Sequence, residues 1–489
     1  MINRTFLISM LLGCLLMATV KLSGAGPYSQ PGFYAPEVIH LDNGLTLILK
    51  ERGEAPNVAI RLVVGVGHDD FAKGAKQTAH MVEHLLYMGT TTHDETEIDR
   101  LIQNHGGYSN AFTGNEETIH HLDIFNQYYL WGLDFLYELL TEASFSEDQV
   151  RMAAGVIARE EGGIPTGVHR WLYEHDITKP VWEMAYDRLL PNSGYQFGLE
   201  GCDNISRDEL LKTFRQFYVP GNMTMIVAGK FERDKLLAKV RETFGRLPVT
   251  ALPERRQWNL PFPIGPAELT GTLAPLFDSE GNVEMMFRTE GVLSADYYAL
   301  QVVDRYLDRK VFEELRFKRG LAYDSGSSYT ANRKWGIIAA GGAVDFDRMG
   351  EVRQVLEAEI DRLRAGEVTA AEIDNVKQRI LLAQANGYES NGAVADYYAD
   401  NLAGFQARGL YQNYEDAIAA VIPAQVSQVA ARYLLRERAV LVMNHPTVTI
   451  EGLSALAVVV AGLAGTMAAW AYWRRRHRKS GEESCQTKP

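Results

Sequence analysis

An internal repeat constrains the fold of this chain more than any other feature of its sequence. The segment FYVPGNMTMIVAG, residues 217–229, resembles YLLRERAVLVMN, residues 433–444, at an offset of 216 residues. Each copy reads as the end of a helix, a short turn and an apolar strand. A repeat this long indicates duplicated domains rather than a solenoid. The chain has 489 residues, which leaves room for two domains of about 200 residues each.

Strand and helix signals alternate in both halves of the chain. Strands are predicted over residues 45–49, 58–66, 118–124, 223–228, 283–287 and 336–344, and helices over residues 128–140, 146–161, 206–218, 298–318 and 369–384. Two capping boxes, at Ser146 with Gln149 and at Thr369 with Glu372, mark helix starts. The mixture predicts an α+β protein with two homologous α/β-sandwich domains in tandem, over residues 38–250 and 267–447. The proline-rich residues 251–266 are predicted to link them.

The N-terminal residues 1–25 are typical of a secretory signal peptide. Arg4 precedes an apolar stretch, and small residues follow at Ser23-Gly24-Ala25. Two alternatives stay open, namely a lipoprotein cleaved before Cys14 and an anchor that is not removed. Each of these interpretations predicts that the following body is exported.

A second apolar run, residues 453–473, contains no charged residue. Its 21 residues are long enough for a helix to cross about 30 Å of bilayer, so we predict a C-terminal transmembrane helix. The basic tail that follows, residues 474–489, is predicted to be cytoplasmic by the positive-inside rule. The localisation predicted for the body is the extracytoplasmic, periplasmic side of the membrane, with the bilayer as a partner of this helix.

Charge and cysteine content exclude some classes of protein. The formal net charge of −13 argues against a nucleic-acid partner. Of the three cysteines, only Cys202 lies in the predicted exported body. No disulfide within the body is therefore expected.

The pentapeptide His-Met-Val-Glu-His at residues 80–84 carries the clearest chemical signal. A spacing of four residues places His80 and His84 one turn apart on one face of a helix, where two imidazoles can hold a transition metal such as zinc. Glu83 can act as a general base toward a water that the metal activates. The alternative is an exposed helix with two solvated histidines. Apolar neighbours on both sides predict a buried helix instead.

Several further segments carry a resemblance to a known family. They are TAHMVEHLLYMGT, GGYSNAFTGNEETIHH at residues 106–121, the turn of Tyr218, Pro220 and Asn222, and LRFKRGLAY at residues 315–323. With them the chain resembles the pitrilysin-type metalloproteases, whose H-x-x-E-H motif defines the inverzincins. It is most similar to the half-length branch that includes mitochondrial processing peptidase and bacterial zinc proteases. The resemblance extends from about residue 38 to residue 445.

The resemblance implies a zinc ion with three protein ligands. Relatives take the third ligand from a glutamate in a helix that reads roughly V-I-x-x-E, which matches residues 156–160 and assigns Glu160. The adjacent Glu161 is the second choice. Two imidazoles and one carboxylate leave a position for water, as catalytic zinc sites do. Ala153 stands where relatives carry a supporting glutamate.

The resemblance also implies catalytic and substrate-binding residues. Glu83 would take the proton of the water, while Arg316 and Tyr323 would help to bind the substrate and the tetrahedral intermediate. Asn110 and Ala111 match an edge-strand segment on which relatives hold extended peptides. Addition of a peptide strand gives backbone affinity with little sequence preference. The implied substrates are therefore unfolded or extended peptides.

Two functions follow as hypotheses. The first is a membrane-anchored zinc-dependent endopeptidase that works as a homodimer or as a heterodimer with a related inactive chain. The alternative is a catalytically weak or inactive subunit that binds peptides or scaffolds a membrane complex, which Ala153 favours. The four residues His80, Glu83, His84 and Glu160 favour the enzyme, because a scaffold does not require them.

Overall fold

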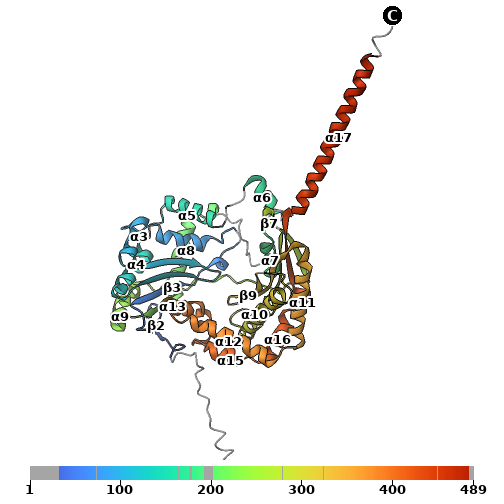
Figure 1. Cartoon of the computed structure of the whole chain (residues 1–489). Helices are drawn as coiled ribbons and strands as arrows, with labels where there is room; N and C mark the ends of the chain where they lie inside the picture. Colours follow the sequence, from blue (N-terminus) through green and yellow to red (C-terminus); the bar gives the residue numbers. More distant parts are fainter. Residues whose placement is uncertain are drawn as a thin grey trace, which may run out of the picture.

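The computed structural model describes residues 32–483, apart from positions 73, 162, 164–165, 176–178, 192–201, 278, 323 and 449. The predicted signal peptide and Tyr323 lie outside the described residues. Two mixed β-sheets stand side by side, each with helices packed against it, and the chain passes from the first to the second (Figure 1). The prediction of an α+β fold with two similar units is confirmed.

The first sheet has six strands in the order β1-β2-β6-β3-β5-β4. Strands β2 and β6 run parallel, and their other neighbours are antiparallel. Strand β6 is buried along its whole length, which explains its continuous apolar sequence. The bounds are Glu37–His40 for β1, Thr46–Glu51 for β2, Asn57–Val64 for β3, Tyr108–Thr113 for β4, Thr118–Phe125 for β5 and Met223–Gly229 for β6.

Helices cover one face of this sheet. Their buried side chains join those of the strands in one apolar core that includes Leu62, Leu85 and Leu136. The capping box predicted at Ser146 is formed, and a second one at Ser206, which was not predicted, starts α8. The helices are α2 Thr78–Tyr87, α3 Glu95–Asn104, α4 Tyr129–Glu142, α5 Glu147–Glu160, α8 Arg207–Phe217 and α9 Arg233–Glu242, with the short α6 Gly167–Glu174 following α5.

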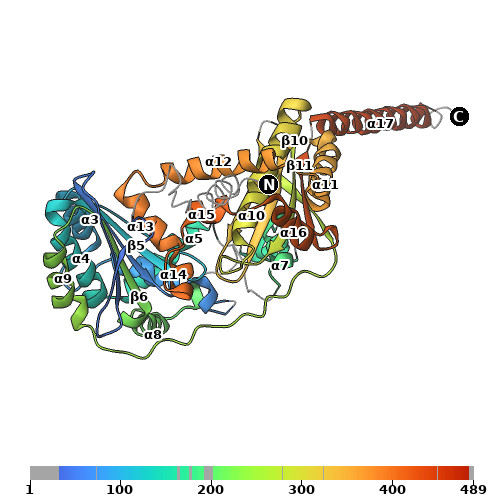
Figure 2. The same cartoon turned by 90° about the horizontal axis from the view of Figure 1, so that it is seen from below.

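The second sheet has five strands in the order β7-β11-β8-β10-β9. Its only parallel pair within the described residues is β7 with β11. The strands are β7 Ala267–Phe277, β8 Glu280–Thr289, β9 Ser325–Ala331, β10 Gly336–Asp345 and β11 Val440–Val448. The order matches that of β2-β6-β3-β5-β4, as a duplication predicts. Residues 248–266, which join the halves, form no helix or strand, and Figure 2 shows them along the outside of the molecule between α9 and β7.

The helices of the second half build a core of their own on one face of this sheet. They are α10 Tyr297–Phe312, α11 Met349–Ala365, α12 Ala370–Asn386, α15 Tyr414–Ala419 and α16 Pro423–Tyr433. The helix predicted over residues 298–318 is α-helical only to Phe312, and residues Glu313–Lys318 form a π-helical turn. Such turns are often found at functional sites.

In each half of the chain, at least one helix packs on the sheet of the other half. Helix α7, Val181–Leu189, packs on the second sheet. Helices α13, Asn391–Asp400, and α14, Leu402–Arg408, pack on the free face of the first sheet with Ile48 and Ile226. This exchange interlocks the halves, although the strands of each sheet come from one half of the chain. The predicted limits of the two domains and of the linker stay predictions.

Arg61 ties the exchanged helix α13 to the first sheet. Its guanidinium bonds Asp123 at 2.7 Å and Asp396 of α13 at 2.5 Å, and its side chain is only 3% exposed. We expect Arg61→Met to lower the free energy of unfolding by about 3 kcal/mol, because it leaves two carboxylates without their buried partner. Chemical denaturation measures this. Arg233→Met, which breaks an exposed pair with Glu37, is the control and should change stability little.

Helix α17, Ile450–Glu483, projects away from the two sheets (Figure 1). It contains the apolar residues 453–473 and continues through the basic run that begins at Arg474. Over the part of the chain that the structure describes, no helix has the length and apolar character needed to cross a membrane. The predicted transmembrane helix is therefore not confirmed, although its residues are helical.

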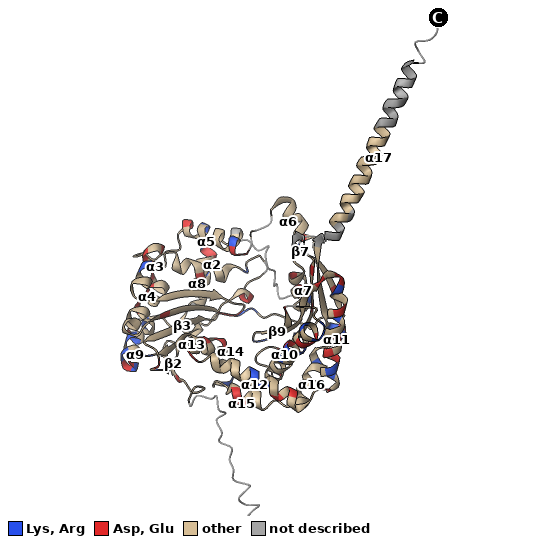
Figure 3. Ribbon diagram, in the orientation of Figure 1, with Lys and Arg blue, Asp and Glu red and all other residues tan. Residues whose placement is uncertain are grey.

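Charged residues of both signs alternate on the outer helices. Figure 3 shows positions of acidic and basic residues together along the ribbons of α9 and α11, for example. A nucleic-acid interface requires a basic surface that neutralises phosphates. The mixed surface does not favour such a partner.

Candidate metal centre

Helix α2 carries the pentapeptide at the centre of the first half. Its apolar residues Ala79, Met81, Val82, Leu85 and Leu86 are buried in the core. The opposite face presents His80 and His84 one turn apart, as the spacing of four predicts. The helix therefore forms because its apolar face packs on the sheet, and this packing fixes where the two imidazoles point.

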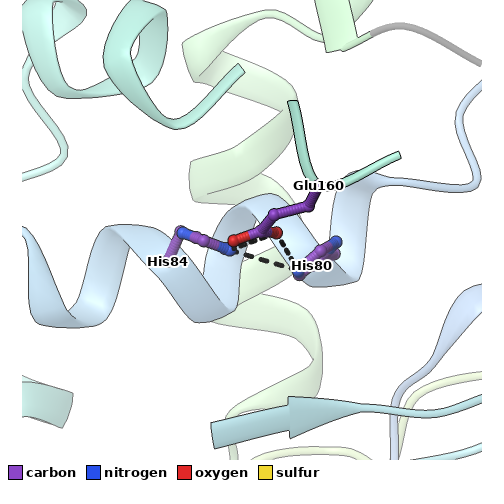
Figure 4. Close-up of side chains that lie close together, drawn as sticks. All are labelled: His80, His84 and Glu160. Carbon is purple, nitrogen blue, oxygen red and sulfur yellow. Dashed lines mark hydrogen bonds and ion pairs between the residues drawn. The ribbon is translucent and has the colours of Figure 1, made fainter. Parts of the chain in front are cut away.

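Glu160 reaches the two histidines from a separate helix. It is the last residue of α5, whose N-terminus is fixed by the Ser146 capping box. Its Oε2 lies 3.5 Å from His80 Nε2 and 3.4 Å from His84 Nε2, and the two Nε2 atoms are 3.1 Å apart. Figure 4 shows the three side chains pointing toward one point between α2 and α5. The structure thus brings together the three residues that were predicted as ligands, and their role as ligands remains a prediction.

The chemistry of this cluster suits a divalent transition metal. One ligand atom from each of the three residues lies within 4.8 Å of the others. Burial, with smaller contributions from His84 and His68, lowers the pKa of His80 to about 3, so its imidazole is neutral, as a ligand must be. The side chains of His80 and His84 are only 19% and 18% exposed, which does not fit two solvated surface histidines. Two imidazoles and a carboxylate are a common set for a catalytic metal.

Gln77 and Glu161 form a chain of hydrogen bonds that begins at His80. His80 Nδ1 donates to Gln77 Oε1 at 3.1 Å, and Gln77 Nε2 donates to Glu161 Oε1 at 3.0 Å. The bond at Nδ1 leaves Nε2 of His80 as the free ligand atom. Glu161, the second choice for the third ligand, thus contacts Gln77, whereas Glu160 contacts both histidines. The sequence did not indicate Gln77, because a single glutamine before a helix carries no recognisable pattern.

Replacing Gln77 is expected to weaken metal binding without removing a ligand. Gln77→Leu deletes the acceptor that orients His80, and loss of such supporting bonds typically lowers metal affinity about 10–100-fold. Competition titrations with zinc and a fluorescent chelator measure the change. Gln103→Leu, on the exposed surface of α3, is the control. An unchanged affinity in Gln77→Leu would show that His80 is oriented by packing alone.

Glu83 lies beside the cluster but is itself buried, with 7% exposed. The hydroxyl of Thr113 donates to its Oε2 at 2.5 Å. Burial is the largest cause that raises the pKa of Glu83 to about 7; the Thr113 hydrogen bond opposes this rise, and the nearby Glu160 adds to it. A cation between the ligands would favour the carboxylate form. An acid with a pKa near neutrality beside a metal site is suited to accept and return a proton.

The remaining candidate residues that the structure describes are on β4 and on the π-helical turn of the second half. Asn110 and Ala111 are on β4, the last strand in the order of the first sheet, so their outer edge has no partner strand among the described residues. Arg316 is in the second half, on the π-helical turn, with its guanidinium 5.6 Å from the ring of Phe312. Tyr323 lies outside the described residues. The structure brings neither Arg316 nor the β4 pair into contact with the three ligand residues.

The structure also places two residues that bear on the alternatives. The ring of His68 lies 6.2 Å from that of His80, and its Nδ1 contacts Lys76 O at 2.9 Å. It therefore neighbours the cluster, although its spacing in the sequence gave no metal signal. Ala153 is fully buried in the core side of α5. A glutamate at this position would enter the apolar core, so its absence here is compatible with the packing around it.

Comparison with protein families gives two matches. Residues 46–165 match the model described as insulinase (peptidase family M16), and residues 204–380 match the peptidase M16 inactive domain. Together the two matched segments cover more than half of the chain. The segment that includes His80, Glu83, His84 and Glu160 is the one that matches insulinase.

Individual relatives are distant in sequence but similar over most of their length. The uncharacterised zinc protease YmxG of Bacillus subtilis is 20% identical over 356 residues, which cover 69% of this chain and 81% of that protein. An uncharacterised zinc protease of Rickettsia felis is 23% identical over 370 residues, 73% of this chain and 86% of that protein. A protease from Helicobacter pylori has a similar fold, with a TM-score of 0.72, 20% identity and coverage of 84% of this chain and 99% of that chain.

Proposed function

The chain belongs to peptidase family M16, and on this premise we propose that it is a zinc-dependent endopeptidase that hydrolyses peptide bonds in unfolded or extended peptides. The observation that carries the proposal is the convergence of His80, His84 and Glu160 beside a buried acid. The relatives named as zinc proteases support zinc as the metal.

His80, His84 and Glu160 would hold the zinc ion, two residues from α2 and one from α5. When bound, zinc supplies a Lewis acid that polarises the scissile carbonyl and activates a water molecule. Glu83 accepts the proton of the attacking water and passes it to the leaving amine. Gln77 keeps the His80 ring oriented, and the core around α2 keeps bulk water away from Glu83.

The peptide is proposed to lie along the open edge of β4. Backbone groups of Asn110 and Ala111 would pair with it as an added strand, which explains a preference for unfolded chains. Arg316 and Tyr323 of the second half are proposed to bind the substrate and the tetrahedral intermediate. Exposed Tyr108 and Phe112 on the same strand offer apolar contacts to peptide side chains.

A peptide-binding or scaffold subunit without activity is the second candidate. The match of residues 204–380 to an inactive domain is compatible with it, as is Ala153. That match runs from just before α8 of the first half to α12 of the second, however, and does not include the ligand residues.

Metal content and cleavage separate the two candidates. The full chain should retain about one zinc ion after dialysis and should cut an unstructured reporter such as reduced, alkylated casein. Treatment with 1,10-phenanthroline should stop cleavage, and added zinc should restore it. A chain that binds the reporter but holds no zinc and cuts nothing would instead be a scaffold.

We also propose that α17 attaches the body to a membrane, on the extracytoplasmic side. Its apolar side chains face outward in this chain, with Val458 72% exposed, and the basic residues that follow can contact anionic lipid headgroups. The full chain should float with vesicles that contain anionic lipid, and a variant that ends at residue 449 should not.

A homodimer, or a heterodimer with a related inactive chain, is the proposed assembly. Light scattering of the full chain and of the variant that ends at residue 449 would test it.

A further inference from the structure

Glu83 is held by a threonine that has no part in the mechanism proposed above. Thr113 is the last residue of β4, and it is 8% exposed, so both partners of the 2.5 Å hydrogen bond are buried. The hydroxyl occupies Oε2 of Glu83. The second carboxylate oxygen is left for proton transfer.

The position of Thr113 does not depend on Glu83. It is paired with Thr118 across the β4–β5 hairpin, and the Thr118 hydroxyl donates to Val66 O at 2.9 Å. The backbone of the hairpin is thus held by contacts other than the bond between Thr113 and Glu83. A donor on a fixed backbone can set the orientation of a flexible carboxylate.

The turn of the same hairpin is tied to the segment that leads into α2. His68 N donates to Gly114 O at 3.0 Å, and Asp69 N donates to Asn115 O at 2.8 Å. A Cβ on Gly67 would lie 2.4 Å from Gly114 O, so only glycine allows this approach. The hairpin is therefore bonded both to the segment that precedes α2 and, through Thr113, to Glu83 of α2.

We propose that Thr113 is a positioning residue, whose hydroxyl holds the Glu83 carboxylate in the rotamer that exchanges a proton with water and leaving group. The inference rests on the proposed peptidase function. A glutamate has three side-chain torsions, and without the hydroxyl nothing among the described residues bonds its carboxylate. Misplacement of a reacting group by about 1 Å can cost about 100-fold in rate.

The second half contains the same pair of groups without a metal cluster among its described residues. Ser327 of the edge strand β9 donates to Asp304 of α10 at 2.7 Å, and Asp304 is also 7% exposed. In the first half, His80 is three residues before Glu83 and His84 is one residue after it. At the same spacing from Asp304 the second half has Gln301 and Arg305. An amide and a guanidinium replace the imidazoles. Ser327 therefore provides a matched control for Thr113.

The test is Thr113→Val in the full, zinc-loaded chain. We expect kcat to fall about 100-fold, with KM and zinc content unchanged, and Thr113→Ser to restore most of the activity. Peptide affinity, measured in the Glu83→Gln background, should not change when Thr113→Val is added. Ser327→Ala should leave kcat as in the wild type.

A readout independent of turnover is the crystal structure of Thr113→Val, in which we expect Glu83 in more than one rotamer. An unchanged kcat together with a single Glu83 rotamer would overturn the proposal, and a loss of stability equal to that of Ser327→Ala would then assign the pair a structural role. A wild-type chain that cuts no peptide would refute the proposed function instead, and the rotamer of Glu83 would still test the positioning.

Discussion

Replacing Glu83 with glutamine is expected to lower kcat for peptide hydrolysis by about 10²–10⁴-fold while the protein keeps its zinc. The amide has the shape of the carboxylate and can still accept the Thr113 hydroxyl, so the fold around it should persist. It cannot accept a proton from water at neutral pH. Single-turnover cleavage of a fluorogenic peptide, with metal content determined on the same sample, measures the effect.

Asp304→Asn is the matched control for this substitution. It neutralises an acid that is equally buried and equally bonded by a hydroxyl, but in the half without the histidines. We expect its kcat to remain close to that of the wild type. If both substitutions reduced cleavage to the same extent, the effect would stem from neutralising a buried acid, and Glu83 would lose its assigned role.

Replacing Glu160 with glutamine is expected to lower zinc affinity by more than about 100-fold, beyond the range of supporting residues. Glu160 is the only carboxylate among the described residues that joins both histidines in one cluster. Without its charge, two imidazoles remain, and two ligands do not complete a zinc site. Competition titration with a chelator of known affinity gives the dissociation constant.

Glu161→Gln tests the choice between two adjacent acids. Glu161 contacts His80 only through Gln77. We therefore expect the zinc affinity of the Glu161→Gln variant to differ from that of the wild type by less than about 10-fold. If Glu161→Gln weakened zinc binding more than Glu160→Gln did, the third ligand would be Glu161 and not Glu160. This result would also mean that the end of α5 rotates when the metal binds.

Local patterns in the sequence were enough to identify most elements and the core of the site. Strand β6 follows from its continuous apolar run and helix α2 from the spacing of its apolar residues, and the helix starts at Ser146 and Thr369 follow from capping boxes. His80, Glu83 and His84 lie within five residues, so the helix alone sets their spacing. The transmembrane interpretation of residues 453–473 was not confirmed over the part of the chain that the structure describes.

The sequence by itself determined the duplicated α+β fold, because the repeated segments are visible in it, and the pair of imidazoles, because a single helix sets their spacing. Only the tertiary structure decided which acid meets them, since Glu160 is brought 3.4 Å from His84 by packing between α2 and α5. The Thr113 hydroxyl at Glu83, the Gln77 amide at His80 and the exchange of α7 and α13 between the halves are likewise contacts between distant segments. Such contacts leave no periodic trace in a single sequence, because side-chain packing in three dimensions selects them.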